Sequence, residues 1–431
     1  MSIVISDVLG LFYQPETGFS LRETAVYIQD GKITSLDRPP EGFTATAHRN
    51  IDGRGKLLMP GLINTHTHSA MTILRNAAND CIFHHWLFEK ILPLEEKLTE
   101  EDCYWGTQLG LMEMLSTGTT CFLDMYFFIH GVAQAVYDAK GRAVLSRGLL
   151  GGAGDPMGEI RLKEAREEVL QWRDRGNLGF MIAPHAAYTC DPGYQREVAA
   201  LAGELDLGIH THIGETQKED HDIRAKYGKS PTALMEETGL LGPRTVAAHC
   251  VCLSEADMAI LRARGVTVAH NPSSNLKLAC GIAPIPRLME LGVNVSLGTD
   301  GTASNNTLNL FGELRLATLL HKGIALDPEL VSAAQGLEMA TINGAHALGL
   351  EQTLGRLAVG FDADLCMLDL GRPNMQPATD HIAALAYSAS GHEVELTIVK
   401  GEILYEKGTF PTIDAQRVLC EIEKTCRRIG L

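Results

Sequence analysis

Short apolar runs alternate with longer amphipathic stretches through the middle of this sequence. Eight of these runs have the length and the β-branched content of buried strands: residues 57–68, 119–124, 142–147, 179–185, 207–212, 245–249, 266–270 and 293–300. Between them lie stretches in which apolar residues recur with helical spacing. Strands that alternate with helices are typical of a parallel sheet, and eight such units predict a (β/α)8 TIM barrel of the α/β class.

One of the intervening helices can be placed in detail. Thr99 precedes Glu100-Glu101-Asp102, which is the spacing of a helix N-terminus with a capping side chain. Apolar residues then recur until Gly118. The pattern therefore predicts a helix that begins after Thr99, ends before Gly118 and leads into the second strand.

The two ends of the chain carry strand and hairpin signals instead. Near the start, Asp30-Gly31 separates two β-rich runs, and near the end Lys400-Gly401-Glu402 does the same. The strands expected at the two ends are residues 25–29, 32–36, 363–369, 396–399 and 403–405.

These terminal strands are too few at either end to bury a core alone. We therefore expect the ends to combine into one composite β-sandwich domain. Residues 1–56 would form its N-terminal part and residues 351–431 its C-terminal part, with the barrel of residues 57–350 inserted between them.

Most of the barrel runs end in a polar residue. The C-terminal ends of parallel strands meet at one face of a TIM barrel, which is where the active sites of such barrels lie. The strand ends that we expect at this face are His66 and His68, Asp124, Arg147, His185, His212, His249, His270 and Asp300.

A metal site can be assembled from four of the residues at these strand ends. His66 and His68 are two residues apart, so their side chains point to the same face of a strand. His212 adds a third nitrogen and Asp300 an oxygen, which leaves one coordination position for water, as in catalytic zinc sites. The fourth strand, residues 179–185, has no lysine that could be carbamylated to bridge a second ion. One divalent metal ion is therefore expected.

Other polar residues have simpler interpretations. His270 precedes Asn271-Pro272 and can cap a turn, while Asp124 can accept hydrogen bonds from local backbone. His210 and His346 fit best as hydrogen-bonded histidines of the core or of a helix.

Composition and charge exclude several functional classes. The 431 residues are 45% hydrophobic, without an apolar run of membrane-spanning length and without a secretory signal at the start, so we expect a cytoplasmic protein. A formal net charge of −16 argues against nucleic acid as the main partner. The ten cysteines are scattered without a C-x-x-C pair, so we expect reduced thiols and a metal held by histidine and carboxylate.

Five segments together resemble the amidohydrolase superfamily, and within it the 5-methylthioadenosine/S-adenosylhomocysteine deaminases. They are residues 64–68 (NTHTH), 212–215 (HIGE), 247–250 (AAHC), 270–278 (HNPSSNLKL) and 297–306 (LGTDGTASNN). Residues 92–95 and 146–149 are closer to the deaminase subgroup than to the superfamily as a whole.

The resemblance implies roles for particular residues. The metal, usually zinc with iron or manganese as alternatives, would be bound by His66, His68, His212 and Asp300. Glu215 would shuttle protons and His249 would orient the attacking water. The residues implied near the substrate are Glu95 and His185 at the ribose hydroxyls, Ser304, and Arg147 and Arg161 at the distal end, where they could bind the carboxylate of S-adenosylhomocysteine.

The activity implied by this resemblance is hydrolytic removal of the adenine 6-amino group. Possible substrates are adenosine, 5′-deoxyadenosine, methylthioadenosine and S-adenosylhomocysteine, and the resemblance does not choose among them. An alternative is a deaminase or chlorohydrolase of another heterocycle of the guanine, cytosine, pterin or triazine type. A catalytically inactive barrel that acts as an assembly scaffold is disfavoured, because no ligand or catalytic partner is missing. We also expect a homo-oligomer.

Overall fold

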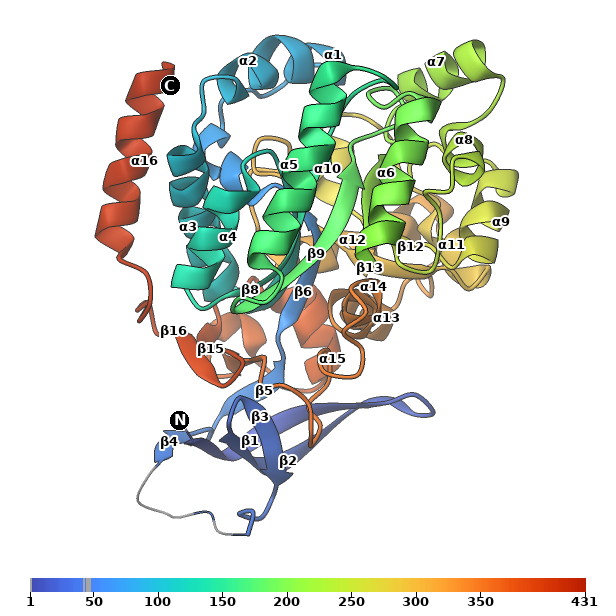
Figure 1. Ribbon diagram of the computed structural model, residues 1–431. Helices are drawn as coiled ribbons and strands as arrows, with labels where there is room; N and C mark the ends of the chain where they lie inside the picture. Colours follow the sequence, from blue (N-terminus) through green and yellow to red (C-terminus); the bar gives the residue numbers. More distant parts are fainter. Residues whose placement is uncertain (1, 42, 44–47) are drawn as a thin grey trace.

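A parallel barrel forms the body of the molecule in the computed structural model, which describes residues 2–41, 43 and 48–431 (Figure 1). Its strands follow one another in chain order, from β6 to β13. They are β6 (Leu62–Thr67), β7 (Thr119–Tyr126), β8 (Arg142–Leu149), β9 (Asn177–Pro184), β10 (Gly208–Ile213), β11 (Thr245–His249), β12 (Thr267–His270) and β13 (Asn294–Leu297). Thr65 Oγ1 donates to the carbonyl of Leu297 across the seam between β6 and β13. The predicted (β/α)8 barrel is confirmed.

Helices surround this barrel. The larger ones are α3 (Glu100–Ser116), α4 (Ile129–Asp138), α5 (Pro156–Trp172), α6 (Pro192–Leu205), α7 (Gln217–Tyr227), α8 (Pro231–Glu237), α9 (Glu255–Arg264), α12 (Leu310–Ala325) and α13 (Ala333–Ala340). Shorter ones are η1 (Ser69–Leu74), α10 (Pro272–Lys277), α11 (Ile285–Glu290) and α14 (Ile342–Ala347). The expected start of α3 is confirmed, because Thr99 and Asp102 form a capping box.

A second sheet combines the two ends of the chain. Its strand order is β16-β15-β14-β5-β1-β2-β3, and β4 pairs with β1. The strands are β1 (Ser2–Gln14), β2 (Gly18–Gln29), β3 (Lys32–Leu36), β4 (His48–Asp52), β5 (Lys56–Pro60), β14 (Leu365–Asp369), β15 (Val394–Val399) and β16 (Glu402–Glu406). Ile5, Ile28, Leu58, Leu365 and Ile398 contribute to one buried apolar cluster. Both expected hairpins and the composite terminal β domain are present.

The apolar run at residues 57–68 is divided between the two sheets. We expected one strand, but Gly61 separates β5, which pairs with β1 and β14, from β6, which pairs with β7. A side chain at Gly61 would lie only 2.1 Å from Thr120 Oγ1, so a residue with a Cβ does not fit there. We therefore propose that the barrel begins after Gly61 rather than at residue 57.

A buried ion-pair network joins the barrel to the terminal sheet. Arg142, the first residue of β8, donates from Nε to Asp364 at 2.7 Å and from Nη2 to Asp362 at 2.9 Å. Lys32 and Lys400 also pair with Asp362. Because both aspartates precede β14, the network fixes the return of the chain into the terminal sheet.

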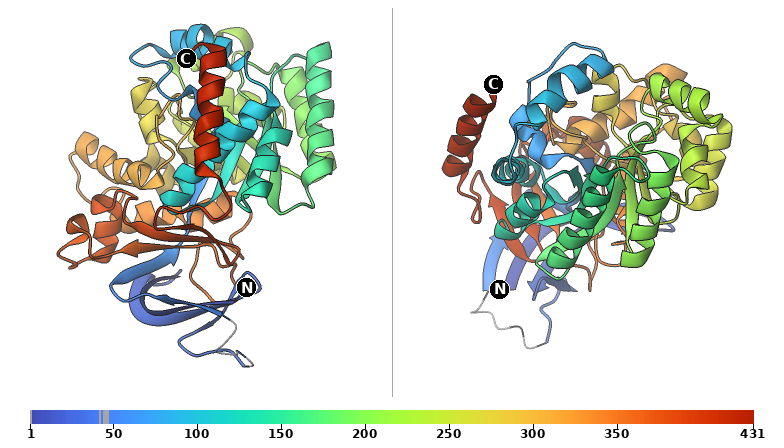
Figure 2. Two further views of the ribbon diagram at one scale, coloured as in Figure 1. Left: turned by 90° about the vertical axis from the view of Figure 1, so that its left-hand side faces the viewer. Right: turned by 45° about the horizontal axis from the view of Figure 1, so that its top comes forward.

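The last helix returns to the barrel. Helix α16 (Ala415–Ile429) lies along α3, as the left panel of Figure 2 shows. Thr425 Oγ1 donates to Asp102 Oδ1, and Arg428 donates to the carbonyl of Lys97. We expected residues 351–431 to form part of the β domain. We therefore propose that α16, which lies within this range, belongs with the barrel instead.

Three short helical segments cover the C-terminal end of the barrel, away from the terminal sheet (Figure 1). They are α1 (Phe83–His85), η2 (Trp86–Ile91) and α2 (Leu92–Glu95). The remaining short segments are η3 (Pro373–Met375), α15 (His381–Ala383) and η4 (Ala384–Ser388). In the described part of the chain, no helix is both long and apolar enough to cross a membrane.

Candidate metal centre and active site

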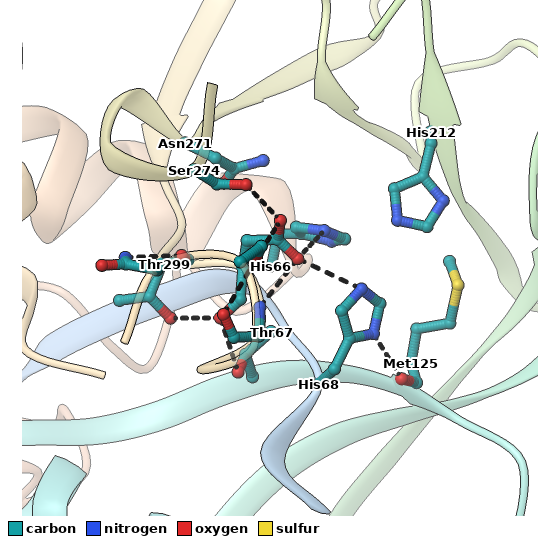
Figure 3. Close-up of polar contacts among 12 residues, drawn as sticks. His66, Thr67, His68, Met125, His212, Asn271, Ser274 and Thr299 are labelled. Carbon is teal, nitrogen blue, oxygen red and sulfur yellow. Dashed lines mark hydrogen bonds and ion pairs between the residues drawn. The ribbon is translucent and has the colours of Figure 1, made fainter. Parts of the chain in front are cut away.

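The C-terminal ends of three barrel strands bring the four expected metal ligands together. His66 lies in β6 with His68 directly after it, His212 lies in β10, and Asp300 follows β13. The rings of His66 and His212 are 4.9 Å apart, and those of His66 and His68 are 5.0 Å apart. Figure 3 shows these three side chains around one space.

Two of these residues have their Nδ1 atoms held by backbone carbonyls. His68 Nδ1 lies 2.7 Å from the carbonyl oxygen of Met125, and His212 Nδ1 lies 2.7 Å from that of His185 (Figure 3). A carbonyl can only accept, so each Nδ1 carries a proton, and Nε2 is the ring nitrogen that can turn to a metal. Such contacts orient metal-binding imidazoles and fix their tautomer.

His66 is held in a chain of buried side chains. Its Nδ1 lies 2.8 Å from Nε2 of His210, whose own Nδ1 lies 3.0 Å from Ser146 Oγ. The Nε2 of His66 is buried and forms no hydrogen bond within the described residues. His210 is thus a satisfied core histidine, as expected, but its partner is a candidate metal ligand.

The donor atoms fall into two overlapping groups that could hold a cation. Donor atoms of His66, His68 and Asp300 lie within 4.8 Å of one another, and so do those of His66, His212 and His249. Three imidazole nitrogens and a carboxylate are a ligand set that suits zinc. The residues present therefore fit a divalent metal. His249 belongs to the second of these groups, so it lies next to the expected ligands.

Asp300 is oriented by a set of hydrogen-bond donors. The hydroxyls of Ser274 and Ser304 donate to its Oδ2 at 2.6 and 2.7 Å, and the N–H of Gly301 donates to its Oδ1 at 2.7 Å. Oδ1 also lies 3.2 Å from His68 Nε2. Ser304, which we expected near the substrate, contacts this carboxylate instead. Ser274 lies in the HNPSSNLKL segment, but nothing in the sequence pointed to its partner.

Asp300 and His249 adopt left-handed backbone conformations. Their φ angles are +61° and +71°, which is uncommon outside glycine. His249 is further fixed by Asn275, whose Oδ1 lies 2.8 Å from its Nδ1. Such conformations are maintained only where the surrounding structure holds them, and they cluster at functional sites.

Glu215 faces the same space from the turn after β10. Its carboxylate lies 3.8 Å from Nε2 of His249, and burial raises its pKa. The turn is held from two sides, because the N–H of Glu215 donates to Glu219 and the carbonyl of Gly214 accepts from Cys252. Sequence reasoning missed Glu219, although its place in the first turn of the following helix is visible in the sequence.

A cavity of about 800 Å³, including the part open to solvent, leads from the surface to these groups. Its polar lining is His68, Glu95, His185, Thr189, His212, Glu215, His249 and Asp300, and its apolar and aromatic lining includes Met71, Phe83, Trp86, Leu87, Phe88, Leu92, Met125, Tyr126, Phe127, Leu150 and Tyr188. Apolar and aromatic walls with a few polar groups gathered in them are typical of a small-molecule site.

Two cavity residues have strongly shifted proton affinities. Burial raises the pKa of Glu95 to about 7, although the Tyr126 hydroxyl donates to its carboxylate at 2.8 Å. Burial lowers the pKa of His185 to about 4, and its Nδ1 lies 3.0 Å from Thr189 Oγ1. Both residues lie in the wall of the cavity, and the ribose contacts that we expect of them stay a prediction.

The two expected distal arginines do not line this cavity. Arg147 donates to the carbonyl of Phe127 and to Glu168, and it also pairs with Glu164. Arg161 donates to the carbonyl of Leu150 at 2.7 Å. The structure thus brings together the metal and catalytic candidates, but it leaves both arginines outside.

Comparisons with known proteins agree with this arrangement. A family model described as the amidohydrolase family matches residues 57–404. The chain belongs to the amidohydrolase family. It is 46% identical over 431 residues to a 5-methylthioadenosine/S-adenosylhomocysteine deaminase of Syntrophomonas wolfei, covering 99% of this chain and 98% of the relative. It is 42% identical to a 5′-deoxyadenosine deaminase of Methanosarcina mazei, with 99% and 98% covered.

A solved structure of this amidohydrolase fold is also similar. It is an adenosine deaminase from Xanthomonas campestris with bound zinc, with a TM-score of 0.93 and 33% identity over 99% of this chain and 98% of that one. The names of these relatives therefore refer to adenine nucleosides that differ in the group at the 5′ carbon. What distinguishes them must be sought in the cavity of each chain.

Proposed function

We propose that this amidohydrolase is a metal-dependent deaminase of adenine nucleosides. Water replaces the 6-amino group of adenosyl thioethers and related nucleosides, giving an inosine-type product and ammonia. The observation that carries the proposal is a largely apolar cavity that reaches the cluster of His66, His68, His212 and Asp300 beside a buried glutamate. The relatives' names support adenine as the base.

We further propose one zinc ion per chain. Its ligands would be His66, His68, His212 and Asp300, with His249 beside them. A bound divalent ion supplies a nucleophilic water at neutral pH, because it lowers the pKa of water from 15.7 to about 7. Strand β9 (Asn177–Pro184) has no lysine that could bridge a second ion.

Glu215 and Asp300 divide the proton transfers. Asp300 takes a proton from the attacking water, while Glu215 delivers one to the ring nitrogen next to C6, so that negative charge does not build up in the purine. Burial raises the pKa of Glu215, which favours the protonated acid that this step needs. As the C–N bond breaks, Asp300 gives its proton to the 6-amino group, which leaves as ammonia, and Glu215 regains a proton from the new C6 hydroxyl, which becomes the carbonyl.

Other residues orient the reactants. His249 directs a lone pair or a proton toward the water, and its ring is fixed through Asn275. Glu95 and His185 would hold the ribose hydroxyls, because both are polar groups in the cavity wall. We place the reaction in the cytoplasm with small nucleosides as substrates, in keeping with a net charge of −16, which disfavours nucleic acid.

The test is turnover of purified, zinc-loaded protein. Adenosine, 5′-deoxyadenosine, methylthioadenosine and S-adenosylhomocysteine should be offered beside guanine, cytosine, a pterin and a chlorotriazine. Ammonia together with the inosine-type product is expected from at least one nucleoside. Turnover of only a free base, a pterin or a triazine would replace this proposal with another reaction of the same family.

A further inference from the structure

The apolar part of the cavity bears on which 5′ group this amidohydrolase accepts. The argument rests on the proposed function, because it takes the adenine C6 to lie at the metal cluster. The 5′ end of the nucleoside then points away from the strand ends, toward the segments that cover them. Those segments contribute Phe83, Trp86, Leu87 and Phe88, and the loop after β8 contributes Leu150.

No cationic side chain faces that region from the described part of the chain. Apart from the imidazoles around the metal cluster and His185, the ionisable side chains that line the cavity are the acids Glu95, Glu215 and Asp300, besides the phenols of Tyr126 and Tyr188. A substrate carboxylate at the apolar end would therefore have no lysine or arginine of the lining to pair with. Burying an unpaired charge beside apolar side chains is unfavourable.

Arg147 is directed away from the cavity by the alternation of its strand. Its neighbour Ser146 points into the barrel, where its hydroxyl contacts His210. Successive side chains of a strand point to opposite faces, so Arg147 points outward, toward helix α5. There it is held by Glu168 at 2.7 Å and by Glu164, both on α5. A rotamer change cannot carry it through the sheet to the substrate.

Arg161 is closer to the cavity but is also engaged. It lies on α5 and donates from Nη1 to the carbonyl oxygen of Leu150, whose side chain forms part of the cavity wall. The guanidinium thus supports the backbone behind the wall. This makes Arg161 the decisive residue for a test, because it is bonded to the backbone of a residue that lines the cavity.

We infer that this chain is specific for small, uncharged 5′ substituents, such as the methylthio group or the 5′-deoxy methyl group, and discriminates against the amino-acid tail of S-adenosylhomocysteine. The apolar side chains from η2 and Leu150 contact the small group. The tail of S-adenosylhomocysteine carries a carboxylate and an ammonium group, which must pass these apolar side chains and lose water there without a lysine or arginine of the lining as a partner.

The size of the discrimination follows from the unpaired charges of the tail. A charged group that loses water without gaining a partner costs on the order of 10–100-fold in affinity, and S-adenosylhomocysteine bears this cost while methylthioadenosine does not. An added methylene-sized group in an apolar pocket is worth about 10–200-fold in kcat/KM. We expect methylthioadenosine to exceed S-adenosylhomocysteine by about tenfold or more in kcat/KM.

The first experiment compares kcat/KM for the four nucleosides on the zinc-loaded enzyme. Methylthioadenosine and 5′-deoxyadenosine should stand above adenosine and S-adenosylhomocysteine. If S-adenosylhomocysteine matches or exceeds methylthioadenosine, the inference is wrong while the proposed function stands. If no nucleoside is turned over, the proposed function has failed and the inference fails with it.

The second experiment replaces the arginines. In Arg161→Met, the ratio of kcat/KM for methylthioadenosine to that for S-adenosylhomocysteine should stay as in the unmodified enzyme. Arg166→Met is the matched control, because Arg166 lies on the same helix and pairs with Glu204 on the surface. A loss confined to S-adenosylhomocysteine in Arg161→Met would show that this arginine binds the tail, and would overturn the inference.

The third experiment tests the apolar wall itself. Phe88 lines the cavity and is 41% exposed, so Phe88→Ala should fold. We expect kcat/KM to fall more for methylthioadenosine than for adenosine, because only the former has an apolar group to place there. An equal or larger loss on adenosine would mean that this wall does not contact the 5′ group.

Discussion

The backbone N–H of Glu215 donates a hydrogen bond of 2.9 Å to Oε2 of Glu219, which lies in the first turn of helix α7. Glu219 is 3% exposed, and burial raises its pKa to about 8. It therefore acts as a positioning residue that keeps the proposed proton shuttle aimed at the cavity. Its other oxygen, Oε1, forms no hydrogen bond within the described residues.

Removing this contact should slow the reaction without emptying the metal site. We expect Glu219→Ala to lower kcat about tenfold with little change in KM, since small displacements of catalytic groups cost rate rather than binding. Glu219→Gln keeps an oxygen that can accept the N–H and should restore most of the rate. If both variants lose equal activity, the hydrogen bond is not what matters.

Glu215→Gln should retain the metal and lose most of the rate. The amide has nearly the same shape but cannot deliver a proton, and general acid catalysis is typically worth about 10²–10⁴-fold. Steady-state kcat and elemental analysis of the same preparation check both parts. An unchanged kcat would remove Glu215 from the proton transfers.

Elemental analysis should give about one divalent ion per chain, as a site of three histidines and one aspartate requires. Removal of the ion by a chelator should abolish turnover, and one equivalent of zinc should restore it. His68→Ala should bind zinc more weakly, because it removes one ligand whose Nδ1 is already held by Met125. A requirement for two ions per chain would contradict the single-ion site.

The acidity of Glu95 predicts a pH dependence. Its pKa is raised to about 7 by burial, so it loses its charge as the pH falls through that value. Only the carboxylate can accept hydrogen bonds from two ribose hydroxyls, so kcat/KM should fall as the solution becomes more acidic. Glu95→Gln is uncharged at every pH, and its kcat/KM should be lower and lack this inflection. The same inflection in the variant would assign it to another group.

Arg142 offers a test of the junction between the two domains. Arg142→Met leaves Asp364 buried without its arginine partner, while Asp362 keeps Lys32 and Lys400. Breaking such a buried pair costs about 3–5 kcal/mol. The free energy of unfolding should fall by about this amount, while kcat at moderate temperature changes little because the network lies at the other end of the barrel. Denaturant titration beside Arg166→Met provides the comparison.

Much of this arrangement was predictable from local sequence signals. The strand and helix periods gave the barrel, and the polar residues at strand ends gave the metal cluster, because parallel strands bring their C-terminal ends to one face. The capping box at Thr99 and both terminal hairpins follow from short-range chemistry in the same way.

The predictions that failed concerned where a strand ends and which face of the strand a side chain points to. We expected β8 to end at Arg147, where its side chain would join the cavity, but the strand continues to Leu149 and Arg147 faces the helices. The apolar run at residues 57–68 is divided between two sheets at Gly61, and our expectation of one strand overlooked Pro60-Gly61, a dipeptide that often marks a break. Contacts such as those of His210 and Glu219 depend on tertiary distances that local patterns do not contain.

The division at Gly61 has a consequence for the growing polypeptide. Strand β5 is paired on one side by β1, which is synthesised first, and on the other by β14, which is synthesised about three hundred residues later. During translation, one row of backbone hydrogen-bonding groups of β5 therefore stays unpaired until β14 is made. This edge lies next to β6, the barrel strand that leads to the candidate ligands His66 and His68. An unpaired strand edge invites pairing with other chains. Newly made protein should thus be most prone to aggregation in the interval before residues 365–369 leave the ribosome.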